Sequence, residues 1–389
     1  MVSRIANPYR PGFNQSPVTL AGREMVMRGI DEALDVAELD GRTPRPVVLV
    51  GSRGVGKTVL LAEAAAHAAE RYSWLTVPVE VRRETPFIPQ LVERLVAVRD
   101  LYDQAPPGGR VTVTAAKIRA SVLGVGGEIE LRRRGTDAEA PTLPLEAALA
   151  AACESAMAHR AGVLVTVDEL QLASPVELGD FSATLQQHVP DGWPLVVVVA
   201  GLPSIRSAHR GVTYFERAEW HLLAMLDMNA ATSALQEPAR LAGRPMSEAA
   251  AQQLAEASGG YPYAIQLLGH HAWRSSTGAD SIEETHAGPA VDAAHRELSD
   301  GLYAARWGDA SPREQEYLLA LADLVAEHPQ VTGGMVARRL GKAAKALSPV
   351  RERLIQKGTI YAEGEVVRFS VPGMAPWVRA ESPYDAGRP

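Results

Sequence analysis

The sequence predicts an α/β fold, in which helices cover a parallel β-sheet and a helical region and a small C-terminal module follow. Three observations predict it. Short apolar segments alternate with helical segments from residue 46 to about 200, as expected for parallel strands joined by right-handed crossovers. A glycine-rich stretch joins the first apolar segment to an alanine-rich helix. From about residue 311 the pattern changes to closely spaced helices followed by two short strands.

Length and composition limit the class of protein. A chain of 389 residues exceeds what one hydrophobic core usually organises, so we expect two or three domains. An apolar content of 46% and a charged content of 22% exclude a disordered, fibrous or disulfide-stapled chain. The single cysteine, Cys153, cannot form an intrachain bridge. The chain begins without a signal-like apolar stretch, and its longest apolar runs are too short to span a bilayer. We therefore expect a cytoplasmic protein that does not contact a membrane.

The first apolar segment, residues 46–50, leads into the motif G-x-x-x-x-G-K-T and then into a helix. In this context the glycines turn backbone N–H groups toward phosphate oxygens, and the helix N-terminus adds a partial positive charge. Lys57 is expected to reach the β- and γ-phosphates, and Thr58 to ligate Mg²⁺. The motif thus predicts a P-loop that binds ATP or ADP with Mg²⁺. The residues expected to bind the nucleotide are Gly51, Ser52, Arg53, Gly54, Val55, Gly56, Lys57 and Thr58.

Two carboxylates follow a second buried strand, at residues 161–168. Because the carboxyl ends of parallel strands meet at one edge of a sheet, we expect Asp168 and Glu169 to lie near the P-loop. Asp168 is expected to bind Mg²⁺, and Glu169 to polarise the attacking water. The sequence therefore predicts an ATPase, with Glu169 and Lys57 as catalytic residues.

Two more strands, at residues 74–81 and 194–200, complete the predicted parallel sheet. The continuous apolar run Val196–Val199 is typical of a strand buried on both faces. An insertion at about 106–144 interrupts the core. Residues 121–131 alternate around a Gly-Gly turn, which favours a hairpin. A solvated decoration and a contact with DNA or a partner are both open for this insertion.

The order of these elements resembles that of AAA+ ATPases, which are P-loop NTPases of the ASCE type. The likeness is to the branch shared by origin-recognition-type initiators and STAND signalling ATPases, and it covers roughly residues 7–378. Beyond the P-loop it is carried by Ala21–Glu24, by Asp168–Gln171 and by Gly260–Pro262. These segments are similar to the N-terminal box near the adenine, to the Walker B segment and to the Gly-x-Pro element of a helical lid. The resemblance implies that Tyr9, Arg23 and Pro262 contribute to the nucleotide site.

The chain departs from this family in its sensor positions. After the fourth strand the family carries a polar side chain that touches the γ-phosphate, and here Ser204 is the only nearby candidate. The lid also lacks the second sensor arginine of many AAA+ proteins, which favours STAND-like switching.

The resemblance places an arginine finger just before the last core strand, where Arg217 stands. Arg206 and Arg210 are alternatives, and a surface arginine without catalytic duty is equally compatible with the sequence. A finger that acts on a neighbouring subunit would make the active form a homo-oligomer.

The C-terminal module is predicted to be a winged helix-turn-helix. Ser311–Glu314 forms a good helix start, with Pro at the first helical position and Glu three residues after Ser. A second helix is expected at 333–340, and a third from about 343 or 348 to 357. Residues 359–362 and 366–371 are expected to form two strands. We therefore divide the chain into an AAA+ core with its insertion, a helical lid, a winged helix and a tail, at residues 1–223, 224–306, 307–380 and 381–389.

Basic residues concentrate in this module. The whole chain carries a net charge of −7, whereas ten Lys and Arg against seven Asp and Glu give residues 310–380 a charge of +3. A basic face on an acidic protein favours a polyanion, so we expect duplex DNA as a partner. A protein partner remains the alternative, because winged helices serve both purposes. The expected DNA-binding residues are Arg338, Arg339, Lys342, Lys345, Arg351, Arg353 and Lys357.

Three functions are compatible with these motifs. The first is an ATP-hydrolysing switch that engages DNA through its winged helix, with nucleotide state controlling conformation or assembly. The second is a slow STAND-type signalling or defence regulator whose winged helix binds a protein. The third is a nucleotide-binding scaffold that never hydrolyses ATP, which the intact Lys57, Asp168 and Glu169 disfavour. We therefore favour the ATPase switch with a DNA-binding module.

Overall fold

The computed structural model describes residues 6–12, 15–106, 122, 143–187, 189, 192–205 and 213–380. Apart from Val122, the expected hairpin at 121–131 lies outside the described residues, as does the tail 381–389. Among the helices that are described, none combines the length and the apolar character that crossing a membrane requires.

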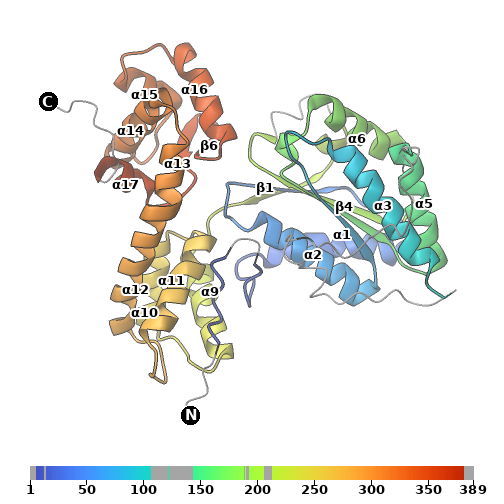
Figure 1. Ribbon diagram of the computed structural model, residues 1–389, viewed down its shortest axis with the longest axis horizontal. Helices are drawn as coiled ribbons and strands as arrows, with labels where there is room; N and C mark the ends of the chain where they lie inside the picture. Colours follow the sequence, from blue (N-terminus) through green and yellow to red (C-terminus); the bar gives the residue numbers. More distant parts are fainter. Residues whose placement is uncertain are drawn as a thin grey trace.

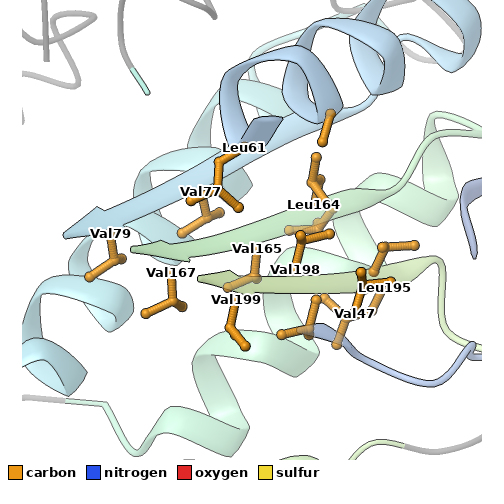
Figure 2. Packing of buried hydrophobic residues seen from close by; sticks show 14 of the residues in the cluster. Val47, Leu61, Val77, Val79, Leu164, Val165, Val167, Leu195, Val198 and Val199 are labelled. Atoms are coloured by element: carbon orange, nitrogen blue, oxygen red, sulfur yellow. The ribbon is translucent and has the colours of Figure 1, made fainter. Parts of the chain in front are cut away.

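Five parallel strands form the central sheet, in the order β2-β3-β4-β1-β5. They are β1 (Val47–Gly51), β2 (Leu75–Glu80), β3 (Val163–Asp168), β4 (Leu195–Gly201) and β5 (Glu219–Leu223). The strands β1, β3 and β4 are buried along their whole length, which explains their continuous apolar sequences. Figure 2 shows valine and leucine side chains of these strands packed against one another and against α2. The predicted parallel sheet is confirmed.

Helices cover both faces of the sheet. Figure 1 shows α1 and α2 on one face and α3, α5 and α6 on the other. Their bounds are α1 (Glu24–Glu38), α2 (Lys57–Tyr72), α3 (Phe87–Asp103), α5 (Leu145–Ala158) and α6 (Pro175–Gln187), with the short η1 (Leu170–Leu172) and α8 (Thr213–Glu216). The apolar sides of these helices and the strands share one buried cluster, so the β-α alternation of the sequence becomes a three-layer core.

The lid region, residues 224–306, is helical. It contains α9 (Met228–Leu241), α10 (Glu248–Ser258), α11 (Pro262–Ser275) and α12 (Glu284–Glu297), followed by the short π-helical η2 (Leu298–Tyr303) and α13 (Ala304–Gly308). Side chains of Asp227 and Ser247 accept hydrogen bonds from backbone N–H groups and so start α9 and α10. The residues that join α12, η2 and α13 have right-handed helical dihedrals, so these three segments form one continuous rod (Figure 1).

The C-terminal module, residues 307–380, consists of four helices and a hairpin. The helices are α14 (Pro312–Glu327), α15 (Gly333–Arg339), α16 (Ala344–Gln356) and α17 (Met374–Ala380), and the antiparallel strands are β6 (Ile360–Glu363) and β7 (Val366–Phe369). The expected capping box is present, with Ser311 and Glu314 bonded to each other's backbone N–H groups. Helix α17 was not predicted from the sequence, and its Trp377 packs against Tyr303 and Trp307.

Buried apolar side chains form two clusters. The first contains the sheet and its helices, and the second runs from the lid region through the C-terminal module without interruption. Tyr9, from the N-terminal segment, also belongs to the second cluster. Because the lid region and the C-terminal module share this core and the α12–η2–α13 rod, we expect them to move as one body. The division between them at residue 306 remains a prediction.

One buried carboxylate joins the first and third helices of the C-terminal module. The Glu314 side chain is 1% exposed and accepts from Arg353 Nε at 3.1 Å and from Lys357 Nζ at 2.9 Å. Burial disfavours its charged form, but hydrogen bonds from Lys357, Ser311 and Arg353 outweigh burial and lower its pKa to about 2. Ionised Glu314 therefore holds α16 against the start of α14.

Replacing Glu314 with Gln should lower the free energy of unfolding at pH 7 by about 1–3 kcal/mol, because two cations lose a buried partner. The folded-state pKa of about 2 lies below the ordinary value of 4.5. The contribution of Glu314 is thus complete above pH 4.5 and is lost as the pH falls toward 2. Calorimetric melting between pH 7 and pH 3 should show the native protein and the variant converging.

The matched control is Glu316→Gln, because the ion pair of Glu316 with Lys342 is exposed, at 37% and 41%. This change should alter melting little at any pH. Equal losses in the two variants would contradict the role of Glu314.

Candidate nucleotide site

The P-loop lies between the end of β1 and the start of α2, at the carboxyl edge of the sheet. Its backbone turns at Gly54 and Gly56, whose φ values are +80° and +96°. These left-handed conformations favour glycine. A side chain at Gly54 would also overlap the hydroxyl of Tyr261 from the lid region. The glycines of the motif therefore serve both the turn of the loop and its contact with the lid.

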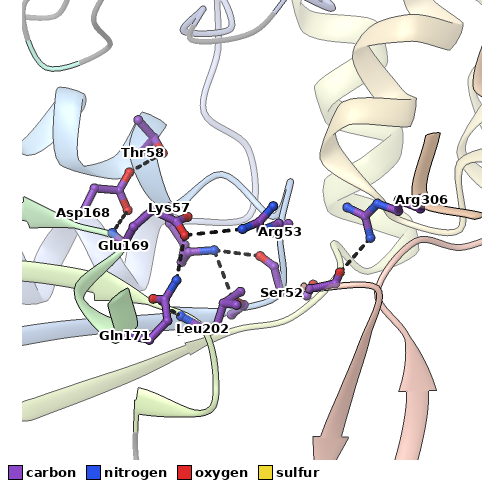
Figure 3. A network of polar contacts seen from close by, with 11 residues as sticks. Ser52, Arg53, Lys57, Thr58, Asp168, Glu169, Gln171, Leu202 and Arg306 are labelled. Carbon is purple, nitrogen blue, oxygen red and sulfur yellow. Dashed lines mark hydrogen bonds and ion pairs between the residues drawn. The ribbon is translucent and has the colours of Figure 1, made fainter. Parts of the chain in front are cut away.

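The Lys57 ammonium is buried inside this loop. Only 5% of Lys57 is exposed, and its Nζ donates to the carbonyl oxygens of Gly51 at 3.1 Å and Ser52 at 2.9 Å. Burial lowers the pKa of Lys57, while the charges of Asp168 and Glu169 raise it in opposition. Two carboxylates and two carbonyls thus surround a buried cation, as Figure 3 shows.

Thr58 and Asp168 meet as the sequence predicts. Thr58 Oγ1 donates to Asp168 Oδ2 at 2.5 Å, and the backbone N–H of Glu169 donates to Asp168 Oδ1 at 2.8 Å. Burial raises the pKa of Asp168, while the Thr58 hydrogen bond and the Lys57 charge lower it. A hydroxyl and a carboxylate side by side are hard oxygen donors of the kind that Mg²⁺ prefers. The donor set therefore fits a Mg²⁺ ion shared with nucleotide phosphates.

Glu169 lies at the end of β3 in an unusual conformation. Its φ of +54° is uncommon for a residue with a side chain, and such backbones concentrate at functional sites. Glu169 Oε2 accepts from Gln171 Nε2 at 2.6 Å and lies 3.9 Å from Arg53 Nη2. With 22% of the side chain exposed, the carboxylate can meet a water molecule. This geometry suits a general base.

Gln171 contacts the end of β4, the region in which a polar sensor was expected. After β4 ends at Gly201, the backbone N–H of Leu202 donates to Gln171 Oε1 at 2.9 Å. Ser204, the expected sensor candidate, lies in the turn that follows. The sequence marks Gln171 only as the last residue of the segment Asp168–Gln171. Its position two residues after Glu169 is the feature of the sequence that could have indicated a contact with this carboxylate.

Arg23 joins the P-loop to the start of the lid region. Its guanidinium donates to the carbonyl of Val55 at 3.2 Å and to that of Ala224 at 2.7 Å. Burial lowers the pKa of Arg23 and the charge of Glu24 opposes that effect. The structure thus places Arg23 at the P-loop, with its side chain bonded to protein carbonyls.

The C-terminal module also reaches the P-loop. Arg306, from α13, donates to the carbonyl of Gly358 at 2.7 Å. A Cβ at Gly358 would come within 2.8 Å of Arg53 Cδ, so Arg53 lies against Gly358. Burial lowers the pKa of Arg306, and the charge of Arg53 lowers it further. The nearby Tyr261 raises this pKa but does not outweigh burial. Arg53 and Arg306 thus both contact Gly358, which lies beside the P-loop. Sequence reasoning missed Arg306 because no motif marks it.

Three further residues were expected at the nucleotide site, and the structure places them as follows. Tyr9 is buried, its hydroxyl donates to the Leu235 carbonyl, and its ring lies against Gly269. This side chain is therefore used in packing the lid region. Pro262 is the first residue of α11, directly after Tyr261. Arg217 is exposed just before β5, and its role as a finger remains a prediction. Arg206 and Arg210 lie outside the described residues.

Four of the seven expected DNA-binding cations are held in ion pairs. Arg339, Lys342, Arg353 and Lys357 form ion pairs with Glu327, Glu316 and Glu314. Within the described part of the chain, the exposed Arg338 and Lys345 form no ion pair. The half-buried Arg351 has a buried Nε without a hydrogen-bond partner. The sequence count of cations therefore overstates the positive charge available to a polyanion.

Comparison with known proteins adds the family. The model of the AAA ATPase domain matches residues 19–199, and that of a domain of unknown function, DUF8462, matches residues 300–378. None of the curated proteins compared with the chain matches it.

Among solved structures, the chain is similar to the Walker-type ATPase PABY2304 of Pyrococcus abyssi. The TM-score is 0.58 at 15% identity, over 92% of this chain and 96% of that one. Cdc6p from Pyrobaculum aerophilum gives 0.47 at 15% identity, over 95% of each chain. The ORC1 protein of Aeropyrum pernix, in complex with DNA, gives 0.46 at 14%, over 95% and 94%. The likeness to the Pyrococcus abyssi ATPase is one of fold. Residues 19–199 therefore match the AAA ATPase domain model, and the chain has the AAA+ P-loop ATPase fold.

Proposed function

We propose that the chain is an ATP-binding and ATP-hydrolysing molecular switch. One observation carries the proposal: Arg53 of the P-loop lies between the candidate base Glu169 and Gly358 of the C-terminal module. A side chain in this position connects the place where ATP is cleaved to the part of the chain that would signal the result. Nucleotide state would then control how the C-terminal module sits against the core.

Each residue of the site has a defined task in hydrolysis. Lys57 neutralises charge on the β- and γ-phosphates, and the loop N–H groups hold them in position. Glu169 accepts a proton from the attacking water. Thr58 and Asp168 would hold Mg²⁺, which neutralises charge on the phosphate oxygens when bound.

Switching rests on the charges that converge on the P-loop. A bound γ-phosphate would add negative charge at the P-loop beside Arg53, whose charge also acts on Arg306. It would therefore favour a new arrangement of both guanidinium groups. Movement of Arg306 would break its bond to Gly358. Because the lid region and the C-terminal module share one core, both would move together relative to the sheet.

The output surface is the C-terminal module, which we propose to be a winged helix that binds duplex DNA. Arg338 and Lys345 on α15 and α16 support contact with phosphates, which positions a protein without reading sequence. The four cations held in ion pairs instead support the second candidate, a STAND-type regulator whose winged helix binds a protein.

The P-loop and Walker B assignments predict different defects. Lys57→Ala should weaken ATP binding by about 100-fold or more, because a buried charge-assisted contact with phosphate is lost. Glu169→Gln should bind ATP within about threefold of native but lower kcat by about 10²- to 10⁴-fold, because the amide cannot accept the proton. Fluorescent-nucleotide titration and steady-state phosphate release measure the two effects. Native affinity in Lys57→Ala would refute the P-loop assignment.

The switch predicts that nucleotides change the contact at Gly358. Amides of residues 354–360 should exchange hydrogen at least about tenfold faster with a non-hydrolysable ATP analogue than with ADP. In Arg306→Ala, exchange should be fast in both states. The control is Arg296→Ala, an exposed arginine of α12, which should behave as native. Equal exchange of the native protein in both states would overturn the switch.

The DNA proposal predicts a salt-sensitive affinity. Arg338→Ala combined with Lys345→Ala should weaken binding of a duplex and lower the slope of log K against log salt by about 2. Arg240→Ala, a change of an exposed lid arginine paired with Glu237, is the control and should leave both unchanged. Absence of any duplex binding by the native protein would direct the search to a protein partner.

A further inference from the structure

The amide of Gln171 bridges the candidate base and the end of β4. Its Oε1 accepts from the backbone N–H of Leu202 at 2.9 Å, and its Nε2 donates to Glu169 Oε2 at 2.6 Å. Because a backbone N–H only donates and a carboxylate only accepts, the two partners fix the orientation of the amide. Both ends of the side chain are therefore used, and neither can turn away without losing a partner.

We propose that Gln171 is a positioning residue for Glu169, and this inference rests on the proposed ATP hydrolysis. Glu169 has a left-handed backbone, a conformation that persists only where its surroundings hold it. The other side-chain partner of the carboxylate, Arg53, lies farther away, at 3.9 Å. Gln171 is thus the shorter of the two contacts that orient the carboxylate.

The bridge also couples Glu169 to β4, which lies between β3 and β1 in the sheet. Gly201 leaves room for it, because a Cβ at that position would come within 2.8 Å of Gln171 Oε1. A shift at the end of β4 therefore reaches Glu169 through one planar amide. Gln171 thus contacts the end of β4, where the family resemblance places a polar sensor, and it acts through the base Glu169.

The test is a double-mutant cycle on ATP turnover. Gln171→Met keeps the length of the side chain and removes both hydrogen bonds, so kcat should fall about tenfold or more while the Kd for ATP stays within about threefold. In the Glu169→Gln background, the same change should alter the residual turnover less than about twofold, since there is no longer a base to position.

A second variant isolates the bond to the base. Gln171→Glu keeps an oxygen for Leu202 but places a carboxylate against Glu169, so kcat at saturating ATP should fall about tenfold or more here too. The control is Gln187→Met at the exposed end of α6, which should match native turnover. Melting temperatures identify any variant that fails to fold.

Each opposite result overturns the inference. Native kcat in Gln171→Met or in Gln171→Glu shows that the bridge does not matter to the base. An equal loss of turnover in the Glu169→Gln background shows that Gln171 acts independently of Glu169. If native protein and Glu169→Gln release phosphate equally slowly, the proposed ATPase function fails first and takes this inference with it.

Discussion

The buried ammonium of Lys57 is the charge around which the rest of the site is arranged. Removing a cation from water is costly unless anions and oriented dipoles replace the lost hydration. Here the carbonyls of Gly51 and Ser52 contact it directly, and the charges of Asp168 and Glu169 favour its ionised form. All of these groups stand at the carboxyl edge of the sheet, because β1 and β3 are parallel and share β4 as neighbour. The sheet topology therefore creates the electrostatics of the site.

The same site is joined to the second half of the molecule by a few polar contacts. Arg23 bonds to carbonyls on both sides of the junction, Tyr261 lies against Gly54, and Arg53 lies against Gly358. The buried apolar side chains instead separate into one cluster for the sheet and another for the lid region with the C-terminal module. Strong packing within each body and polar contacts between them suit a molecule in which charge at the P-loop decides how the two bodies meet.

The sequence predicted the sheet and the P-loop well because both depend on local patterns. Continuous apolar runs specified β3 and β4, and the spacing of Gly51, Gly56 and Lys57 specified the loop. Gln171 and Arg306 were missed because their roles depend on contacts that only the folded chain creates, with Leu202 and with Gly358. The basic residues of α15 and α16 could be counted, but their pairing with Glu314, Glu316 and Glu327 follows from tertiary packing. Helix α17 was missed for a similar reason, since its Trp377 fits a gap beside Tyr303 and Trp307.

The rod made by α12, η2 and α13 gives the molecule a lever. It extends from Glu284 to Gly308, which at a helical rise corresponds to a length of about 37 Å. A rotation of about 10° at one end of such a rod moves its other end by roughly 6 Å. Arg306, which bonds to the Gly358 carbonyl, lies two residues before the C-terminal end of this rod. In the proposed switch, a rotation of this size would move the far end of the rod by more than a β-strand spacing.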